Sequence, residues 1–372
     1  MSLRPLISAA MIVRNEERFL EDCLVSLQGF ADEVVIVDTG SSDRTREIAT
    51  AHGARLYDMA WRDDFSLARN FALDQARGDW ILYIDADERV TADDVHALRA
   101  DLEDRSIIAA TVRFKPFTGN TAYPEFRLVR NRPDIRFEGA MHETYIPSIN
   151  RILASGEGRV VSAAVTMQHI GYDDDQSHKL ERNRTLLIKQ IERSPDRLYL
   201  RWHLGCVYRD LGQTAEAVEQ WTVGVEKARA AQVRISEEAF CFVELARHAI
   251  STGQDPRPII DEGLLFQPDH LLLQALNASE LLSADAPEAA LMIYESHAAI
   301  DAETFISPIS YETRLFGSNA QAGIGACLFK MGRYDEAARA FDLAYRLEPT
   351  ATELRMKAVV ARSRAGAAPE VL

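Results

Sequence analysis

The sequence predicts two domains: an α/β domain with a mixed sheet flanked by helices, and an all-α domain of helical hairpins. Two observations support this prediction. The first half alternates short apolar runs with helical patterns, whereas after about residue 172 strand signals stop and Leu- and Ala-rich helical sequence continues. The length of 372 residues also fits two domains, at roughly 100–200 residues each. We place the domains at residues 1–175 and 176–372.

Short apolar runs separated by helical patterns predict a βαβαβ order at the start of the chain. The expected strands are 7–13, 33–37, 55–57 and 80–84. The expected helices are 16–27, 66–76 and 92–102, with Ser66 as the N-cap of the second. A further helix is expected to be capped by Ser42 or Asp43 and to end near His52. This order favours a mostly parallel sheet with helices on its faces.

From Ile107 onward the pattern changes. Strands are expected at 109–115, 125–129 and 160–167, with Gly, Pro and Asn turns between them and no clear helix. Strands joined without helices favour antiparallel or mixed pairing in this part of the sheet.

Composition and charge exclude several classes of protein. The formal net charge is −15, whereas a general nucleic-acid binder is usually basic. No apolar stretch approaches the roughly 20 residues of a membrane span. The apolar run that starts at Leu6 meets Arg14 too soon for a signal peptide, so a cytoplasmic protein is expected. The four cysteines contain no C-x-x-C pair, which predicts reduced core thiols and no zinc site.

A repeat marks the helical half. The segment from Leu204 to Trp221 recurs 120 residues later, from Ile324 to Phe341. The matching small and large residues are Gly205, Gly212, Ala217 and Trp221 in the first copy, and Gly325, Gly332, Ala337 and Phe341 in the second. This pattern is typical of tetratricopeptide hairpins, with weaker copies near 263–268 and 289–294. Generic helical hairpins are the alternative.

Asp85 and Asp87 follow the buried strand expected at residues 80–84. Ligands of open α/β sheets bind beyond the carboxyl ends of the strands, so these carboxylates should face a cleft. In an extended chain, carboxylates two residues apart point the same way and can share one hard divalent cation. Asp38 also follows a buried strand and can accept hydrogen bonds from a nucleobase or ribose. Its alternative role is a helix cap, for which Asp43 is better suited.

Several blocks follow one another within residues 6–185. They are Ala10–Glu17, Val35–Asp43, Phe65–Asn70, Gly78–Glu88, Phe126–Asn131, Phe137–Glu143 and His169–Tyr172, with Lys179 and Arg182 after them. Together these blocks resemble the family 2 glycosyltransferases of the GT-A fold, and in particular the bacterial branch that carries tetratricopeptide repeats.

The resemblance implies a nucleotide site. In this family the residue at Asp38 contacts the uracil or ribose of a UDP-sugar. The loop with Val13, Asn15 and Glu16 lines the nucleoside pocket, and Arg69 lies near the nucleotide.

The resemblance also implies a metal. Asp87 would bind Mn²⁺ or Mg²⁺ directly, and Asp85 would support the ribose or a metal-bound water. His169 is a candidate third metal ligand, with a structural histidine as the alternative. Lys179 and Arg182, three residues apart on an expected helix, share a face and could reach the diphosphate. The alternative for this pair is a solvated basic face, and Arg127 and Arg130 are similar candidates.

A general base must lie close to the proton that it removes from the acceptor. The E-D pair that many family 2 enzymes use for this purpose is absent about a hundred residues after Asp87. Glu143 is the candidate base, with a solvated or salt-bridged glutamate as the alternative.

These observations together predict a metal-dependent, inverting transfer of a sugar from an NDP-sugar, with UDP preferred. The acceptor, a glycan, peptide or small molecule, cannot be identified from the sequence, and the helical domain would present a peptide acceptor or form a homodimer. An NDP-sugar-forming nucleotidyltransferase is disfavoured because residues 8–20 contain no Gly. The other alternative is an interaction scaffold with an inactive α/β domain, which the clustered carboxylates disfavour. The dinucleotide-binding and Walker glycine motifs are absent.

Overall fold

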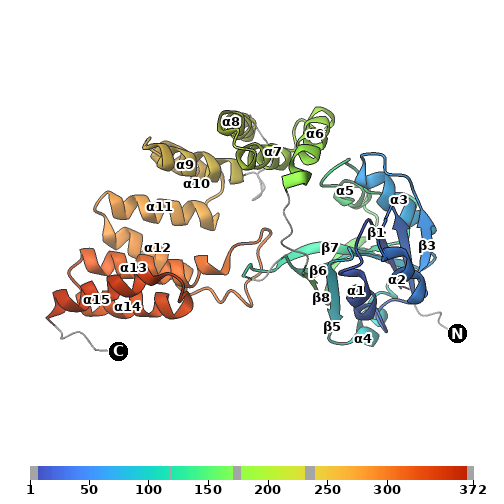
Figure 1. Ribbon diagram of the computed structural model, residues 1–372, viewed down its shortest axis with the longest axis horizontal. Coiled ribbons are helices and arrows are strands. Elements are labelled where there is room, and N and C mark those ends of the chain that lie inside the picture. The colour runs from blue at the N-terminus through green and yellow to red at the C-terminus, as the bar shows by residue number, and fades with distance from the viewer. Residues whose placement is uncertain (1–6, 117–118, 171–176, 231–238, 367–372) are drawn as a thin grey trace. The chain divides into compact units, whose positions relative to one another are not determined.

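The structure is a computed structural model that describes residues 7–116, 119–170, 177–230 and 239–366 (Figure 1). The chain divides into two compact units. The first contains the described residues of 1–118 and 122–194 together with 306–308, and the second contains residues 119–121 and the described remainder from 195. The domain boundary expected at 175/176 lies outside the described residues.

The first unit contains an eight-stranded sheet in the order β3-β2-β1-β4-β7-β6-β8-β5. Its strands are β1 (Ile7–Val13), β2 (Glu33–Asp38), β3 (Arg55–Asp58), β4 (Trp80–Tyr83), β5 (Glu88–Ala92), β6 (Ile107–Lys115), β7 (Tyr123–Arg130) and β8 (Arg159–His169). Strands β1 to β4 pair in parallel, β7 is antiparallel to both β4 and β6, and β8 is parallel to β6 but antiparallel to β5. The predicted mixed α/β sheet is confirmed.

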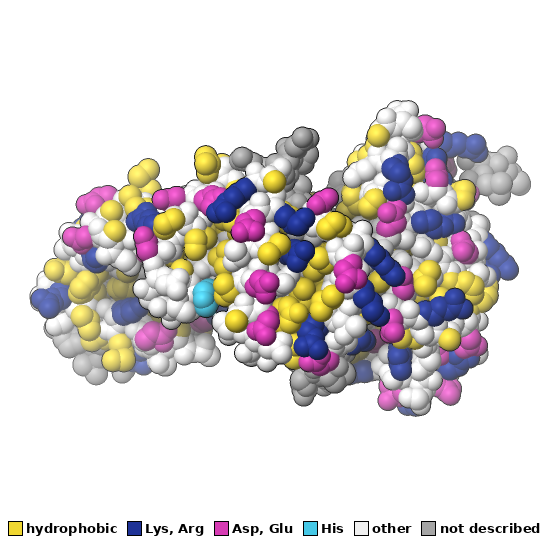
Figure 2. Space-filling view, turned by 90° about the horizontal axis from the view of Figure 1, so that it is seen from above, with side chains coloured by type: hydrophobic (Ala, Val, Ile, Leu, Met, Phe, Trp, Pro, Cys, Tyr) yellow, Lys and Arg dark blue, Asp and Glu magenta, His cyan; other side chains and the backbone are white. Residues whose placement is uncertain are grey.

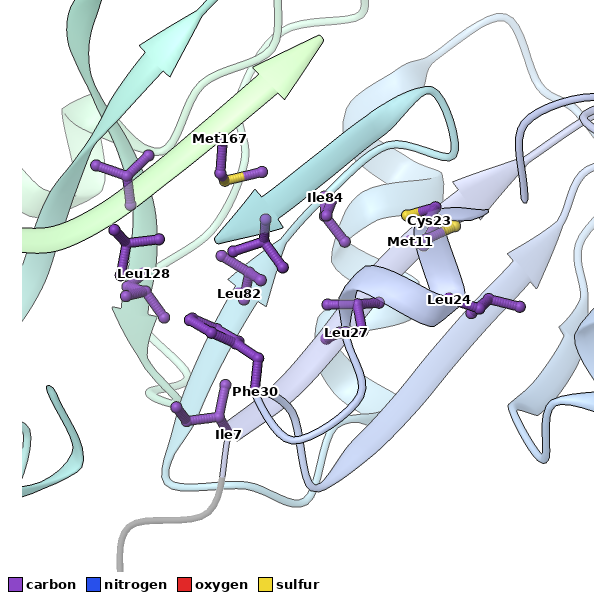
Figure 3. Packing of buried hydrophobic residues seen from close by; sticks show 14 of the residues in the cluster. Ile7, Met11, Cys23, Leu24, Leu27, Phe30, Leu82, Ile84, Leu128 and Met167 are labelled. Atoms are coloured by element: carbon purple, nitrogen blue, oxygen red, sulfur yellow. The ribbon is translucent and has the colours of Figure 1, made fainter. Parts of the chain in front are cut away.

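Helices cover both faces of this sheet. They are α1 (Leu20–Ser26), α2 (Thr45–Ala51), α3 (Phe65–Gln75), α4 (Val95–Asp101) and α5 (Ile146–Ala154), and the same unit also contains α6 (Ser177–Arg193). Helices α1, α2 and α4 contribute to one apolar core, and α3 and α5 contribute to another. Figure 3 shows Leu27, the residue after α1, on the side of the sheet residue Leu82.

Some local expectations were wrong. Strand β5 was not predicted, because its sequence, Glu-Arg-Val-Thr-Ala, is short and polar. Helix α5 was not expected among the later strands, although its apolar residues recur at helical spacing and Pro147 stands in its first turn. Ser66 is not the N-cap of α3; the side chain of Asp64 accepts the hydrogen bond from the Leu67 amide instead.

The second unit is a series of helices: α7 (Leu198–Asp210), α8 (Thr214–Ala230), α9 (Phe240–Thr252), α10 (Arg257–Phe266), α11 (Leu271–Ser283), α12 (Pro287–Ala298), the 3₁₀ turn η2 (Thr313–Leu315), α13 (Ser318–Lys330), α14 (Tyr334–Leu347) and α15 (Thr352–Ala365). The repeat predicts how two of its hairpins pack. A Cβ added at Gly325 would lie 2.8 Å from the Phe341 ring, and one at Gly205 would clash with Trp221 in the same way. The glycine of each pair therefore leaves the space that the aromatic ring of its partner occupies.

None of the described helices is long and apolar enough to cross a membrane. Acidic and basic side chains are interspersed on the face shown in Figure 2.

Candidate active site

A cavity of about 340 Å³ lies at the carboxyl ends of β1, β2 and β4. Parallel strands end at the same edge of a sheet, which is why sequence-distant polar residues meet there. The residues that line the cavity are Ile12, Val13, Arg14, Glu16, Thr39, Trp61, Phe65, Arg69, Asp85, Ala86, Asp87, His169 and Arg182.

Asp87 and His169 meet at this cavity. His169 Nε2 lies 3.0 Å from Asp87 Oδ2, and His169 Nδ1 lies 3.1 Å from the Pro116 carbonyl. Since a carbonyl only accepts, Nδ1 carries a proton and Nε2 faces the aspartate. Burial acts to lower the pKa of His169, but the hydrogen bond to Asp87 and the nearby carboxylates outweigh it, so the pKa is raised.

Asp85 and Glu143 share one arginine. Arg69 Nη1 and Nη2 donate to the two oxygens of Asp85 at 2.9 and 3.1 Å, and Arg69 Nε donates to Glu143 Oε1. The Arg69 guanidinium also lies 4.4 Å from the ring centroid of Tyr83. Burial acts to raise the pKa of Asp85, but the charge and hydrogen bonds of Arg69 outweigh it and lower the pKa. The arginine therefore joins two of the predicted site residues.

The loop after β1 packs on the loop after β2. Asn15 has a φ of 57°. Its backbone amide donates to Ser41 Oγ, and its side-chain Oδ1 accepts from the Ser42 backbone amide. The Glu16 amide donates to Thr45 Oγ1. These bonds fix the turn that places Val13 and Glu16 in the cavity wall, and they explain why α1 begins later than expected. Asn15 itself is not among the lining residues.

Asp38 lies behind this wall and is only 2% exposed. Its carboxylate accepts from the amides of Gly40 and Ser41 and from Arg46. Burial acts to raise its pKa, but the bonds from Arg46 and Ser41 outweigh it and lower the pKa. Direct contact between Asp38 and a nucleoside stays a prediction, while its bonds to the 40–41 turn are structural. The cap expected at Ser42 or Asp43 was wrong: the N-cap of α2 is Arg44, and Asp43, one residue earlier, accepts a hydrogen bond from the Thr45 amide.

One wall of the cavity is basic. Arg14 and Arg182 both line it, and Arg182 lies over the Phe65 ring at 5.9 Å. Burial and the positive charge of Arg14 lower the pKa of Arg182, so the two guanidinium groups repel each other. The side chain of Lys179 lies outside the described residues.

Sequence reasoning missed Trp61, which lines the cavity and makes an edge contact with Phe65 at 4.7 Å. It stands in an irregular segment between β3 and α3, where no periodicity marks it. Arg14 and Thr39 could have been found, since each adjoins a predicted site residue. Arg127 is buried against Glu88 and does not line the cavity, and Arg130 bonds backbone carbonyls such as that of Ile107.

Two segments of the chain match models of known protein families. Residues 8–153 match the family model described as glycosyl transferase family 2, and residues 318–351 match that of the tetratricopeptide repeat. The first unit contains a glycosyl transferase family 2 domain. The predicted combination of this domain with C-terminal tetratricopeptide sequence is confirmed.

Two curated relatives illustrate the similarity. A TPR repeat-containing protein of Synechococcus elongatus is 38% identical over 222 residues, which cover 58% of this chain and 55% of the relative. The SPbeta prophage-derived glycosyltransferase SunS of Bacillus subtilis is 28% identical over 145 residues, covering 37% of this chain and 34% of SunS. The match thus spans about half of the first relative and a third of the second.

Solved structures with a similar arrangement were also found. A mannosyltransferase of Pyrobaculum calidifontis, in complex with GDP-Man and Mn²⁺, has a TM-score of 0.41 at 17% identity, covering 75% of this chain and 88% of the other. Glucosyl-3-phosphoglycerate synthase of Mycobacterium tuberculosis, in complex with Mn²⁺ and UDP-glucose, has a TM-score of 0.37 at 15% identity, covering 51% and 79%.

Proposed function

We propose that this protein is a metal-dependent, inverting glycosyltransferase that moves a sugar from an NDP-sugar, with UDP preferred, to an acceptor. The observation that carries the proposal is the Asp87–His169 pair at a 340 Å³ cavity, in the unit whose residues 8–153 match glycosyl transferase family 2. Within our proposal the catalytic domain spans residues 1–175 and the helical domain 176–372.

Asp87 and His169 suit a divalent cation such as Mn²⁺ or Mg²⁺. Their facing atoms are 3.0 Å apart. Adjacent ligands of an octahedral ion have about this separation when each lies about 2.1 Å from the metal. The Pro116 carbonyl orients the imidazole, as outer partners of metal-binding histidines do. No group of three or more His, Cys, Asp or Glu side chains arranged for a metal occurs among the described residues, so the donor diphosphate would complete the coordination.

The cavity walls supply the remaining contacts to the donor. Val13, Glu16 and Thr39 line one side, where the nucleoside would lie, and the Trp61 ring offers an apolar face to a base. Arg14 and Arg182 supply positive charge for the diphosphate, which would relieve their mutual repulsion. A bound cation would act as a Lewis acid toward the departing diphosphate.

In the transfer step the acceptor nucleophile forms a bond to the anomeric carbon as the carbon–oxygen bond to the diphosphate breaks. The acceptor proton must leave at the same time, and we assign it to Glu143. Arg69 holds Glu143 Oε1 and fixes this carboxylate relative to Asp85. Glu143 does not itself line the cavity, so the proposal requires the acceptor to approach past Arg69.

The helical unit suggests a binding role, because tetratricopeptide stacks commonly hold partner chains. It contains an apolar cavity of about 410 Å³. The residues that line this second cavity are Leu282, Ala326, Phe329, Lys330, Phe341, Met356, Lys357 and Val360. We propose that this unit holds a peptide acceptor or a second copy of the chain.

Calorimetric titration of UDP, GDP and dTDP, each with Mn²⁺ and with EDTA, tests the proposal. We expect one nucleotide, UDP, to bind much more tightly with Mn²⁺ than with EDTA. The folded protein binding none of them would reject the proposal and favour a scaffold. Equal binding with Mn²⁺ and with EDTA would reject the metal site but would still support the nucleotide site.

A further inference from the structure

A buried ion pair lies under the segment that carries Asp85 and Asp87. Arg127 of β7 donates to both oxygens of Glu88 at the start of β5, at 2.9 and 2.8 Å. The two side chains are 3% and 2% exposed. Neither lines the 340 Å³ cavity, so neither is placed to touch a ligand there. A buried ion pair is weak support for stability, since its desolvation offsets most of its attraction.

Glu88 connects to the residues proposed to hold the metal. Its Oε2 accepts from the Asp85 amide at 2.9 Å, and its own amide donates to the Asp85 carbonyl at 3.0 Å. In the β5–β8 ladder Glu88 pairs with His169, and the Ile170 amide donates to the Asp87 carbonyl at 2.8 Å. The Glu88 side chain thus holds the Asp85 end of the Asp85–Asp87 segment, and the Glu88 backbone lies opposite His169 in the ladder.

Arg127 is itself held in place on several sides. Its guanidinium lies 4.0 Å from the ring centroid of Tyr83 and 4.6 Å from that of Phe114, and it donates to Glu125 at 3.1 Å. The Tyr83 ring is also in contact with Arg69, the arginine that binds Asp85. The bidentate geometry fixes the plane of the Glu88 carboxylate, which a single hydrogen bond would not do.

We propose that the Glu88–Arg127 pair is a positioning device that presets Asp85, Asp87 and His169 to receive the metal and the donor diphosphate. The inference deepens the proposed function and rests on it. Glu88 and Arg127 act through the Asp85 amide and the β5–β8 ladder rather than by contact with substrate. Loss of the pair should therefore weaken the metal-dependent part of donor binding more than the metal-independent part.

The test compares UDP affinity with Mn²⁺ and with EDTA in the full-length chain. The variants are Glu88→Gln, Arg127→Lys and the double variant Glu88→Gln/Arg127→Met, which leaves no uncompensated buried charge if a single variant fails to fold. Glu33→Gln is the matched control, because Glu33 also binds an arginine, Arg55, and a backbone amide, but far from the cavity.

We expect the double variant and Glu88→Gln to lose about 10–100-fold in affinity with Mn²⁺, as loss of outer partners of metal ligands does. Their affinity with EDTA should match that of the wild type, Arg127→Lys should retain part of the Mn²⁺ effect, and Glu33→Gln should retain all of it. Wild-type affinity in the double variant would overturn the inference. Equal losses with Mn²⁺ and EDTA would overturn it as well, since they would indicate a general structural role.

Hydrogen exchange over residues 84–90, measured without nucleotide, separates this inference from the proposed function. Exchange should be faster in Glu88→Gln than in the wild type and unchanged in Glu33→Gln. If the wild type binds no nucleotide, the proposed function fails, and the exchange comparison still decides whether the pair holds this segment. Unchanged exchange in Glu88→Gln would overturn the inference whatever the nucleotide result.

Discussion

Replacement of Arg69 by methionine tests the charge arrangement of the site most strictly. The substitution keeps the apolar stem and removes the guanidinium that binds Asp85 and Glu143. Arg69 and Glu143 are each 10% exposed, and Asp85 is 30% exposed. Loss of one partner of a fully buried pair lowers the free energy of unfolding by about 3–5 kcal/mol. Because Asp85 is partly solvated, we expect a loss of about 2–4 kcal/mol at neutral pH.

The pH dependence of this loss provides a second check. In the wild type the pKa of Asp85 is lowered, so its contribution to stability is present above its unfolded-state pKa and is lost as the pH falls through the folded-state value. In Arg69→Met the pKa of Asp85 is raised relative to the wild type, because burial still raises it and only the weaker charges of Arg127 and His169 remain to lower it. A carboxyl group with a raised pKa destabilises the fold more as the pH rises. The difference in unfolding free energy between the wild type and Arg69→Met should therefore become smaller as the pH falls from about 7 to about 5.

Urea unfolding followed by circular dichroism at several pH values measures the deficit. Arg55→Met is the matched control, because Arg55 also binds a carboxylate, Glu33, and lies over a tyrosine ring. The control should lose stability without any change in nucleotide binding, whereas Arg69→Met should lose both. A deficit below about 1 kcal/mol, the size typical of an exposed pair, would refute the reasoning, as would one that does not change with pH.

Three further predictions concern single residues. Asp87→Ala should abolish the Mn²⁺ dependence of UDP binding while leaving the thermal unfolding temperature near that of the wild type; retained Mn²⁺ dependence in calorimetry would remove Asp87 from the metal site. Glu143→Gln should bind donor normally but give no transfer in a product assay, and full activity would eliminate Glu143 as the base. In the helical unit, burial lowers the pKa of His270 from 6.5 to about 4, and neither ring nitrogen has a hydrogen-bond partner among the described residues. The stability associated with neutral His270 should therefore fall by about 2 kcal/mol between about pH 7 and pH 5, and His270→Phe should remove that part of the acid sensitivity in urea unfolding; an unchanged sensitivity would contradict the assignment.

Much of the fold could be predicted because local patterns determine it. The strand expected at 7–13 is β1 itself, and the Gly205 and Gly325 positions of the repeat mark real helix contacts. Strand β5 escaped prediction because its pairing with the distant strand β8 stabilises a sequence with little strand character of its own. Tertiary pairing overrides weak propensity in such cases.

The candidate site was predictable where residues adjoin the ends of strands. Asp85, Asp87 and Glu16 line the cavity as that rule implies. The partners of these residues were not predictable, because Arg69 reaches Glu143 across 74 positions and no sequence pattern records such a contact. For Asp38, the neighbouring turn and Arg46 already use the carboxylate in hydrogen bonds, which spacing alone does not show.

The most direct test of the central claim is anomalous diffraction at the manganese edge from crystals grown with UDP and Mn²⁺. The account predicts one manganese peak within bonding distance of Asp87 Oδ2 and His169 Nε2, with the diphosphate of UDP as a further ligand. A manganese peak that contacts neither residue, or UDP bound in the cavity without manganese, would contradict it.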